Sequence, residues 1–366
     1  MRRGQRRVGD GVKLYGRSHD RQSLARHAGD LSAAGGVRAV VLDDGSERGI
    51  RTLEFRTGGG LSFDVLVDRA MDLGGAEFEG RGFGWRSATG FRHPGLHEYR
   101  DDDGLSMMRS FSGLLLTAGL DHTLFGAEVD ASQYRYPPRG TAVHALHGRV
   151  ANLPARLTGY GERWQDDGRC VLWAEGEVRQ AAIFGEHLRL TRRIEADLGG
   201  SEIRLTDRVR NAGFDPTPHM YLYHVNVGWP FLDEGARYEL PPHRTLWRSD
   251  SVAEQGVSHT AMPAPLPGFV EQVYEHELKP DAAGLARPRL VNERLGVYFE
   301  LEFDTVRFPS FFQWLHLREG AYAVGFEPST HHVQGEAAAR EDGSMTFLAP
   351  GEEREYTTAF RVGHLD

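Results

Sequence analysis

The sequence predicts an all-β protein, built as a large antiparallel sandwich with one short helix near its N-terminus. Three observations lead to this fold class. Apolar and polar residues alternate along many segments, as they do in strands that bury one face of a sheet. Hairpin-like turn signals separate these segments, and the 45 glycines among 366 residues exceed the usual share of ~7%. Helical crossovers of the kind that join parallel strands are not apparent.

The N-terminal segment is expected to contain a basic, frayed terminus and the helix. Residues 1–13 hold four arginines and no following apolar run, so they do not resemble a signal peptide, and we expect a cytoplasmic protein. Ser and Asp start signals and Gly29 as a stop signal predict a helix over residues 18–29. Residues 14–366 are expected to form a single domain, because no repeat or convincing linker interrupts them.

The strands follow from period-2 alternation. It is clearest over 61–67 and 297–303, where every second residue is apolar. Two further segments, 188–194 and 203–209, carry a charged residue on the face that is otherwise apolar. A strand is also expected at 321–326, after a hairpin turn at 318–320. Other turns are predicted at 43–45, 166–168, 199–200 and 342–344, and a Pro-rich surface loop at 262–267.

Composition excludes several classes of function. The formal net charge of −9 argues against a nucleic-acid partner, which would require a basic face. No run approaches the ~18 apolar residues that span a bilayer, so no membrane partner is expected. A single cysteine, Cys170, excludes a disulfide framework and a multi-cysteine zinc site. We expect the partner to be a small molecule. The oligomeric state stays open.

Four segments concentrate polar residues: 67–74, 144–149, 219–230 and 312–332. In the last, Pro328 cannot donate to a ladder, so strand pairing is expected to end about there, with Glu327 at the strand exit. A carboxylate at a strand exit between aromatic walls has a raised pKa and can act as a base near neutral pH. Trp314 would supply one such wall. Aromatic faces also suit the apolar C–H edges of sugar rings.

The third segment places His224 and Asn226 on one face of a strand, where the histidine can act as a proton donor oriented by its neighbour. Histidines also raise the possibility of a metal site. His-x-x-His at 144–147 would, on a strand, direct its two side chains to opposite faces, and the zinc-protease helix motif is absent. No Gly-x-Ser-x-Gly elbow and no phosphate-binding glycine loop are present. We therefore predict no metal and no cofactor.

Taken together, these segments resemble the aldose 1-epimerase (galactose mutarotase) superfamily, and within it an aldose 1-epimerase-like branch of unknown function. The superfamily elements occur in order as Leu-His-Gly at 146–148, Tyr-His-Val-Asn at 223–226, Phe-Glu-Pro at 326–328 and Pro-Gly-Glu at 350–352. The resemblance covers residues 14–362. Marks of the branch itself are Asp-Arg-Ala-Met-Asp at 68–72, Arg-Ser-Phe-Ser-Gly at 109–113, Leu-His-Gly-Arg at 146–149 and the segment 223–230.

The resemblance implies a supersandwich with a sugar pocket and a role for each matching residue. Glu327 would take the proton from the anomeric hydroxyl, and His224 would protonate the ring oxygen. His147 and Arg69 would hold the sugar. The expected substrate-binding set is completed by Asn226, Gln313, Arg149 and Trp314.

The implied activity is mutarotation of a free sugar or sugar derivative. It needs one base, one acid and no cofactor, because no redox change occurs. We expect Glu327 and His224 to face each other across about the width of a sugar ring. The sequence leaves the sugar open among hexose, pentose, ketose and uronate. Two other functions also remain open: a non-catalytic carbohydrate-binding protein, and a metal-dependent sugar isomerase or lyase using histidines among His144, His147, His224, His331 and His332.

Overall fold

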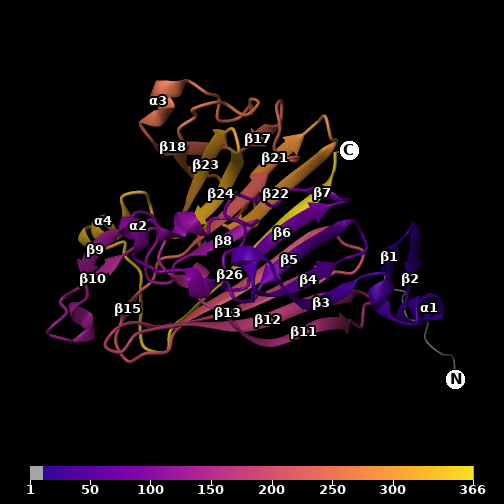
Figure 1. Cartoon of the computed structure of the whole chain (residues 1–366), viewed down its shortest axis with the longest axis horizontal. Coiled ribbons are helices and arrows are strands. Elements are labelled where there is room, and N and C mark those ends of the chain that lie inside the picture. Colours follow the sequence, from indigo (N-terminus) through magenta and orange to yellow (C-terminus); the bar gives the residue numbers. More distant parts are fainter. Residues whose placement is uncertain (1–10, 366) are drawn as a thin grey trace.

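The computed structural model describes residues 11–365, and its regular structure consists mainly of antiparallel strands (Figure 1). The all-β prediction is confirmed. Most of the predicted basic terminus, residues 1–10, lies outside the described residues. Val12–Leu14 already forms strand β1, which pairs with β2 (Arg17–His19). None of the described helices is long and apolar enough to cross a membrane.

Three larger sheets form the body of the molecule. The largest has the order β11 (Arg156–Trp164), β12 (Cys170–Ala181), β13 (His187–Asp197), β14 (Glu202–Asn211), β26 (Glu353–His364), β22 (Val297–Asp304), β21 (Arg289–Asn292) and β17 (Arg237–Glu239), with β20 (Leu285–Ala286) also paired to β22. The six-stranded sheet has the order β18 (His243–Arg248), β19 (Gln272–Leu278), β23 (Ser310–Arg318), β24 (Ala321–Ser329), β16 (Leu222–Gly228) and β8 (Leu115–Ala118). The five-stranded sheet is β3 (Gly36–Val41), β4 (Arg51–Arg56), β5 (Leu61–Leu66), β6 (Asp72–Phe78) and β7 (Arg81–Gly82).

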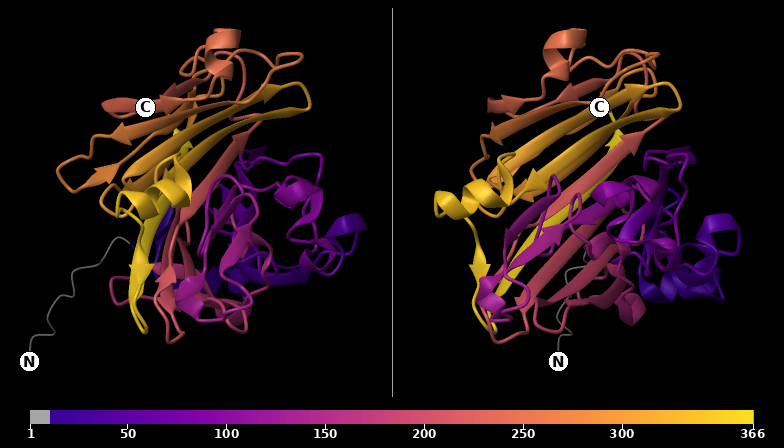
Figure 2. Two further views of the ribbon diagram at one scale, coloured as in Figure 1. Left: turned by 90° about the vertical axis from the view of Figure 1, so that its left-hand side faces the viewer. Right: turned by 60° about the vertical axis from the view of Figure 1, so that its left-hand side comes forward.

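Smaller elements lie at the ends of these sheets. Two further strand pairs are β9 (Ala127–Asp130) with β10 (Thr141–His144), and β15 (Thr217–Pro218) with β25 (Phe347–Leu348). The α-helices are α1 (Arg21–His27), α2 (Asp101–Gly104), α3 (Ser251–Gln255) and α4 (Gly335–Glu341). Short 3₁₀ helices cover Leu31–Ala33, Gly45–Glu47, Pro94–Leu96, Ser106–Arg109, Ser132–Tyr134 and Val150–Asn152. Helices α2 and α4 gather with β9 and β10 at one end of the molecule, opposite α1 (Figure 1). Helix α3 lies at the top of the molecule in the same view, near β18 (Figure 1), and the turned views also show it there (Figure 2).

The predicted N-terminal helix is confirmed, although it is shorter than expected. Asp20 is its N-cap and accepts a hydrogen bond from the Ser23 amide at 2.6 Å. Ser18 and His19 belong instead to β2, where they pair with β1. Leu24 is the buried residue that anchors the helix to the core.

The two charged interruptions predicted within strands meet in the core. Register pairs Arg192 on β13 with Asp207 on β14, and their side chains form two hydrogen bonds of 2.9 and 2.7 Å. Arg192 also contacts Asp72 at 2.5 Å, and the hydroxyls of Tyr221 and Tyr223 donate to Asp207. A buried arginine is tolerated here because its single positive charge is paired with two carboxylates, those of Asp207 and Asp72.

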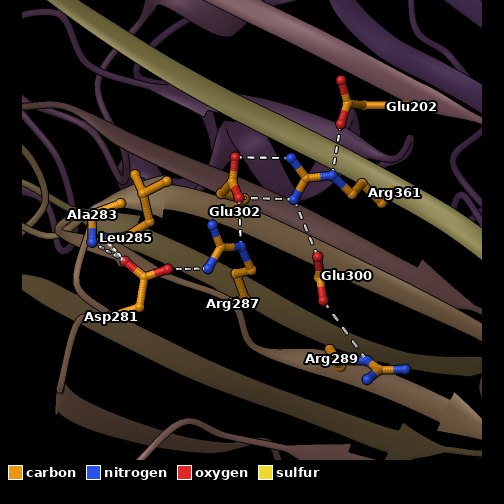
Figure 3. A network of polar contacts seen from close by, with 9 residues as sticks. All are labelled: Glu202, Asp281, Ala283, Leu285, Arg287, Arg289, Glu300, Glu302 and Arg361. Carbon is orange, nitrogen blue, oxygen red and sulfur yellow. Dashed lines mark hydrogen bonds and ion pairs between the residues drawn. The ribbon is translucent and has the colours of Figure 1, made fainter.

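The opposite face of the largest sheet carries charged side chains in a ladder (Figure 3). Arg361 on β26 donates to Glu202 and Glu302, and contacts Glu300 on β22 at 3.1 Å. Arg287 also donates to Glu302, at the Oε2 that Arg361 contacts. Alternation along β22 and β26 therefore separates an apolar core face from a solvated, ion-paired face.

The six-stranded sheet positions the candidate site. Strands β23 and β24 form the predicted hairpin, with Arg318 paired to Ala321 across a turn in which Gly320 has a φ of 76°. Pairing was expected to end about Pro328, and it ends one residue later, at Ser329. Pro328 stands opposite Phe311 and the strand continues to Ser329. On its other side, β24 pairs with β16 only at Leu222–Ser329 and from Val225–Phe326 onward, so the missing amide of Pro328 falls within an interrupted stretch of that ladder.

Candidate active site

A cavity of about 640 Å³ lies on the six-stranded sheet. Strands β16, β23 and β24 contribute its floor, and loops from both halves of the chain contribute its walls. Most of the lining is apolar or aromatic, which is typical of small-molecule sites. Its polar lining residues are Ser87, Thr89, His147, His224, Glu271, His316 and Glu327.

Glu327 and His224 are the central polar pair of this cavity. Both are buried, with 4% and 3% of their surfaces exposed. His224 Nε2 and Glu327 Oε1 are 3.2 Å apart, but the approach is not aligned as a hydrogen bond. Glu327 Oε1 and His224 Nδ1 have no hydrogen-bond partner among the described residues. The pair is therefore close, desolvated and unsatisfied.

The direct contact corrects the expectation that a sugar ring's width separates these two groups. The register that pairs Leu222 with Ser329 and Val225 with Phe326 places His224 directly opposite Glu327. Opposed residues of neighbouring antiparallel strands have Cβ atoms about 5 Å apart, so their side chains meet when they point to the same face. The pair presents its two groups side by side to the cavity.

Burial shifts both groups toward their neutral forms. It raises the pKa of Glu327 well above its ordinary value, and the nearby Glu271 carboxylate raises it further. Burial also lowers the pKa of His224 well below its ordinary value. His147 adds to that decrease, and the Asn226 side chain opposes it. Burial thus favours a carboxylic acid at Glu327 beside a neutral imidazole at His224.

His147 reaches the cavity from a tight turn. Its backbone has a φ of 60°, and Gly148 follows with a φ of 72°. A Cβ on Gly148 would lie 2.5 Å from the carbonyl oxygens of Gly119 and His122, so only glycine fits there. The Leu124 amide donates to His147 Nδ1 at 3.3 Å, which leaves Nε2 as the protonated nitrogen of a neutral ring. Burial lowers the pKa of His147 to about 4.

Aromatic rings surround the pair. The Trp314 and Phe111 ring centroids lie 5.3 and 4.7 Å from that of His224, and Trp85 packs edge-on against Phe111 at 5.2 Å. Trp314 Nε1 donates to Glu271 Oε2 at 2.8 Å, which fixes the indole. These faces form a wall suited to the apolar side of a sugar ring.

Gly325 makes room for the carboxylate. It lies two residues before Glu327 on β24, on the same face of the strand. A Cβ added at Gly325 would lie 2.7 Å from Glu327 Oε1 and 2.9 Å from the Trp314 Cβ. The absence of a side chain at Gly325 therefore allows the Glu327 carboxylate to turn toward His224.

The structure brings Glu327, His224, His147 and Trp314 together, but Gln313 and Asn226 do not line this cavity. Gln313 points to the other face of β23, where its Oε1 accepts from His259 at 3.0 Å. The Asn226 side chain donates instead to backbone carbonyls, those of Gly113 at 3.3 Å and His224 at 3.1 Å. Asn226 acts on the site through His224, because its side chain opposes the decrease in the pKa of that histidine.

Arg69 and Arg149 also lie outside the cavity. Arg69 is fully buried and donates to the Ser110 carbonyl at 2.7 Å, below the loop that carries Phe111. The Arg149 guanidinium stacks on the Tyr99 ring at 4.2 Å. It lies beside a separate small cavity.

Sequence reasoning did not identify Glu271 or Trp85 as part of the site. Glu271 directly precedes β19 and follows the Pro-rich loop, and no local pattern distinguishes it. Trp85 lies in a loop after β7. Phe111 had a signal, since it belongs to the Arg-Ser-Phe-Ser-Gly segment noted at 109–113.

The five histidines considered for a metal do not form one cluster. His147 and His224 belong to the cavity, His332 contacts Glu275, and His331 contacts Thr330. His144 instead stacks on His122, near Glu336. Within residues 11–365, His122, His144 and Glu336 form the one group of three whose ligand atoms lie close enough together to hold a metal ion.

Known proteins of similar sequence or structure agree with the fold described above. A family model described as "Domain of unknown function (DUF4432)" matches residues 47–362. No curated protein matches the chain. Solved structures with the same fold include a candidate aldose 1-epimerase from Klebsiella pneumoniae, 22% identical with a TM-score of 0.77 over 90% of this chain and 83% of that one. A galactose mutarotase-like protein from Clostridium acetobutylicum is 12% identical, with a TM-score of 0.60 over 90% and 98%. A candidate aldose 1-epimerase from Escherichia coli K12 is 14% identical, with a TM-score of 0.54 over 84% and 97%. These neighbours confirm the resemblance drawn from the motifs and establish the shared fold.

Proposed function

Because the chain belongs to the DUF4432 family and shares the fold of mutarotase-like proteins, we propose that it interconverts the anomers of a free, uncharged sugar. The observation that carries this proposal is the buried pair of Glu327 and His224 in an aromatic cavity. Unsatisfied titratable groups with opposed pKa shifts are typical of acid–base sites.

The reaction needs one proton donor and one acceptor at the anomeric centre. The base removes the proton of O1 while the acid protonates the ring oxygen. The ring then opens, the aldehyde rotates, and the ring closes on the other face. We assign the base to Glu327 and the acid to His224. Each positioned group contributes ~10²–10⁴-fold to the rate.

The carboxyl proton of Glu327 must first move to His224. Burial favours the neutral forms of both groups. Moving the proton from Glu327 to His224 across the 3.2 Å contact creates the carboxylate and imidazolium that the assignment requires. Sugar hydroxyls that donate to the carboxylate favour this charged form, as hydrogen bonds to a charged group do.

The lining residues also indicate the class of sugar. No lysine or arginine lines the cavity among the described residues, whereas two carboxylates do, at Glu271 and Glu327. A uronate or a sugar phosphate would therefore meet no lysine or arginine and would be repelled by any ionised carboxylate. We expect a neutral hexose, pentose or ketose. The volume of about 640 Å³ leaves room for a substituent on the sugar. Met107 and Met108 in the lining favour an apolar one.

Anomer exchange measured by NMR across neutral sugars and uronates tests the proposal. We expect acceleration for at least one neutral sugar, and loss of that acceleration in Glu327→Gln and His224→Asn. Glu277→Gln, on an exposed part of β19, is the matched control and should retain full activity. No acceleration for any sugar in the panel would overturn the proposal.

A non-catalytic carbohydrate-binding protein is the second candidate. The direct contact between His224 and Glu327 favours it, because no sugar ring fits between the two groups in this geometry. Calorimetric titration with the same sugars separates the candidates. A binder would show affinity without turnover in the unmodified chain, and Glu327→Gln would change that affinity little. An enzyme would lose rate in the variant while binding stays largely intact.

A further inference from the structure

A second cluster of chemically competent side chains lies outside the sugar cavity. His122 comes from the loop after β8, His144 ends β10, and Glu336 lies in the first turn of α4. All three are buried, and one ligand atom from each lies within 4.8 Å of the others. Figure 1 shows α4 beside β9 and β10 at this end of the molecule.

The hydrogen bonds of His122 define which nitrogen is available. Its Nε2 lies 2.7 Å from the carbonyl oxygen of Phe125, which can only accept, so Nε2 carries the hydrogen. Its Nδ1 lies 3.1 Å from Glu336 Oε2, which also accepts when ionised. Two lone pairs at this distance need a cation between them, either a proton or a metal ion. A histidine that donates one N–H to a carbonyl while its other nitrogen faces a carboxylate has the arrangement of a metal ligand.

The other two groups complete a donor set. His144 stacks on His122 with ring centroids 4.6 Å apart and planes within 4° of parallel. Its Nδ1 is buried and has no hydrogen-bond partner among the described residues. Arg340 holds Glu336 Oε1 at 2.8 Å and so orients Oε2 toward His122.

We propose that His122, His144 and Glu336 bind a divalent transition-metal ion, with zinc as the best match. Two imidazoles and one carboxylate are a common donor set for zinc, which takes four ligands at about 2.0–2.2 Å. Ligands of a tetrahedral ion lie roughly 3.3 Å apart, so any of the three ligand atoms that lie farther apart than this must approach one another as the ion binds. A cavity of about 20 Å³ beside His144 has room for about one water molecule.

The ion would join three segments that are far apart in sequence and support one wall of the sugar cavity. The loop that carries His122 continues to Leu124 and Phe125, which both line that cavity. The Leu124 amide also donates to His147. A metal ion at this position therefore stabilises the wall without touching Glu327 or His224. This role does not depend on the reaction proposed for the cavity.

Metal content and zinc titration of the untagged full-length protein test the inference. We expect about one zinc per chain by elemental analysis, removal by a chelator, and a melting temperature that rises when zinc alone is added back. His144→Asn and Glu336→Gln should weaken zinc binding by at least about tenfold, which is 1.4 kcal/mol. His187→Asn, the same change at a histidine outside the cluster, should leave it unchanged.

Circular dichroism establishes that each variant is folded before it is titrated. Two results would overturn the inference. One is a folded protein that neither contains nor takes up zinc, manganese or iron, which would assign the cation between His122 and Glu336 to a proton. The other is zinc uptake that is equal in the parent protein, His144→Asn and Glu336→Gln.

Discussion

Two buried clusters of ionisable groups both involve strand β16, and they are built in opposite ways. Beneath the sheets, Arg192 forms two hydrogen bonds with Asp207 and a further one with Asp72, and two tyrosine hydroxyls complete the shell of Asp207. In the cavity, Glu327 and His224 touch without a good hydrogen bond, and each has an atom that lacks any partner.

The difference separates a structural cluster from a functional one. A buried charge whose hydrogen bonds are all made holds strands together and offers nothing to a ligand. A buried acid and base with unmade hydrogen bonds are costly unless a ligand completes them. Strand β16 carries both kinds, since Tyr223 serves the structural cluster and its neighbour His224 serves the cavity. Because neighbouring residues of a strand point to opposite faces, one strand directs Tyr223 to the structural cluster and His224 to the cavity.

Removing the cation from the structural cluster should have the largest effect on stability. Arg192→Met leaves Asp207 and Asp72 buried without their partner, and we expect a loss of about 3–5 kcal/mol in the free energy of unfolding. Urea unfolding measures it. Adding Asp207→Asn should restore part of the loss by removing one unpaired charge. A loss below about 1 kcal/mol for Arg192→Met would mean that the cluster is not the structural element described here.

Disturbing the cavity should affect activity and leave stability largely intact. Gly325→Ala places a Cβ 2.7 Å from Glu327 Oε1, so the carboxylate must move. A misplacement of about 1 Å can cost ~10²-fold in rate, and we expect kcat for anomer exchange to fall by about that factor. The affinity for the sugar should change by less than about threefold, since binding depends mainly on the cavity walls. An unchanged kcat in a folded variant would contradict a positioning role for Gly325.

The opposed pKa shifts predict how stability depends on pH. The folded pKa of Glu327 lies above 4.5, so the folded state binds the extra proton, and stability falls as pH rises from 4.5 through that raised pKa. The folded pKa of His224 lies below 6.5, so its contribution to stability is lost as pH falls from 6.5 toward that lowered pKa. The two slopes have opposite signs, so they oppose each other at any pH where both groups titrate.

Urea unfolding as a function of pH checks this. As pH rises above 4.5, the parent protein should lose stability relative to Glu327→Gln, because the variant lacks the titrating group. Below pH 6.5, His224→Asn should lose less stability than the parent protein. Parallel curves for the parent protein and both variants would show that the pair is not desolvated as described.

Much of this arrangement could be predicted from the sequence. Period-2 alternation predicted the strands at 61–67 and 297–303, and β5 and β22 confirm them. Three of the four polar segments contain His147, His224, Trp314 and Glu327, which all line one cavity, whereas Arg69 of the first segment lies outside it. The type and order of the residues were sufficient for these predictions, because each of the side chains belongs to a strand or turn that the local sequence pattern indicates.

The remaining features depend on register and on distant segments. Nothing local indicates that His224 stands opposite Glu327, since that follows from how β16 aligns with β24. The position of Gln313 could have been predicted, because neighbouring residues on a strand point to opposite faces and Trp314 was assigned to the cavity. Glu271 enters through the indole of Trp314, a contact between segments 43 residues apart. Such contacts are set by tertiary packing.

The surface ladder supplies the smallest expected effect and tests whether burial decides the comparison. Arg361 has three acidic neighbours, Glu202, Glu300 and Glu302, whereas Arg192 has two, but 28% of the Arg361 side chain is exposed (Figure 3). Water replaces the lost hydrogen bonds of exposed groups, so Arg361→Gln should cost only about 0.5–1 kcal/mol in urea unfolding. High salt should reduce that difference further, because it screens exposed charges. If Arg361→Gln costs as much as Arg192→Met, the number of ion pairs and not their burial determines stability in this fold.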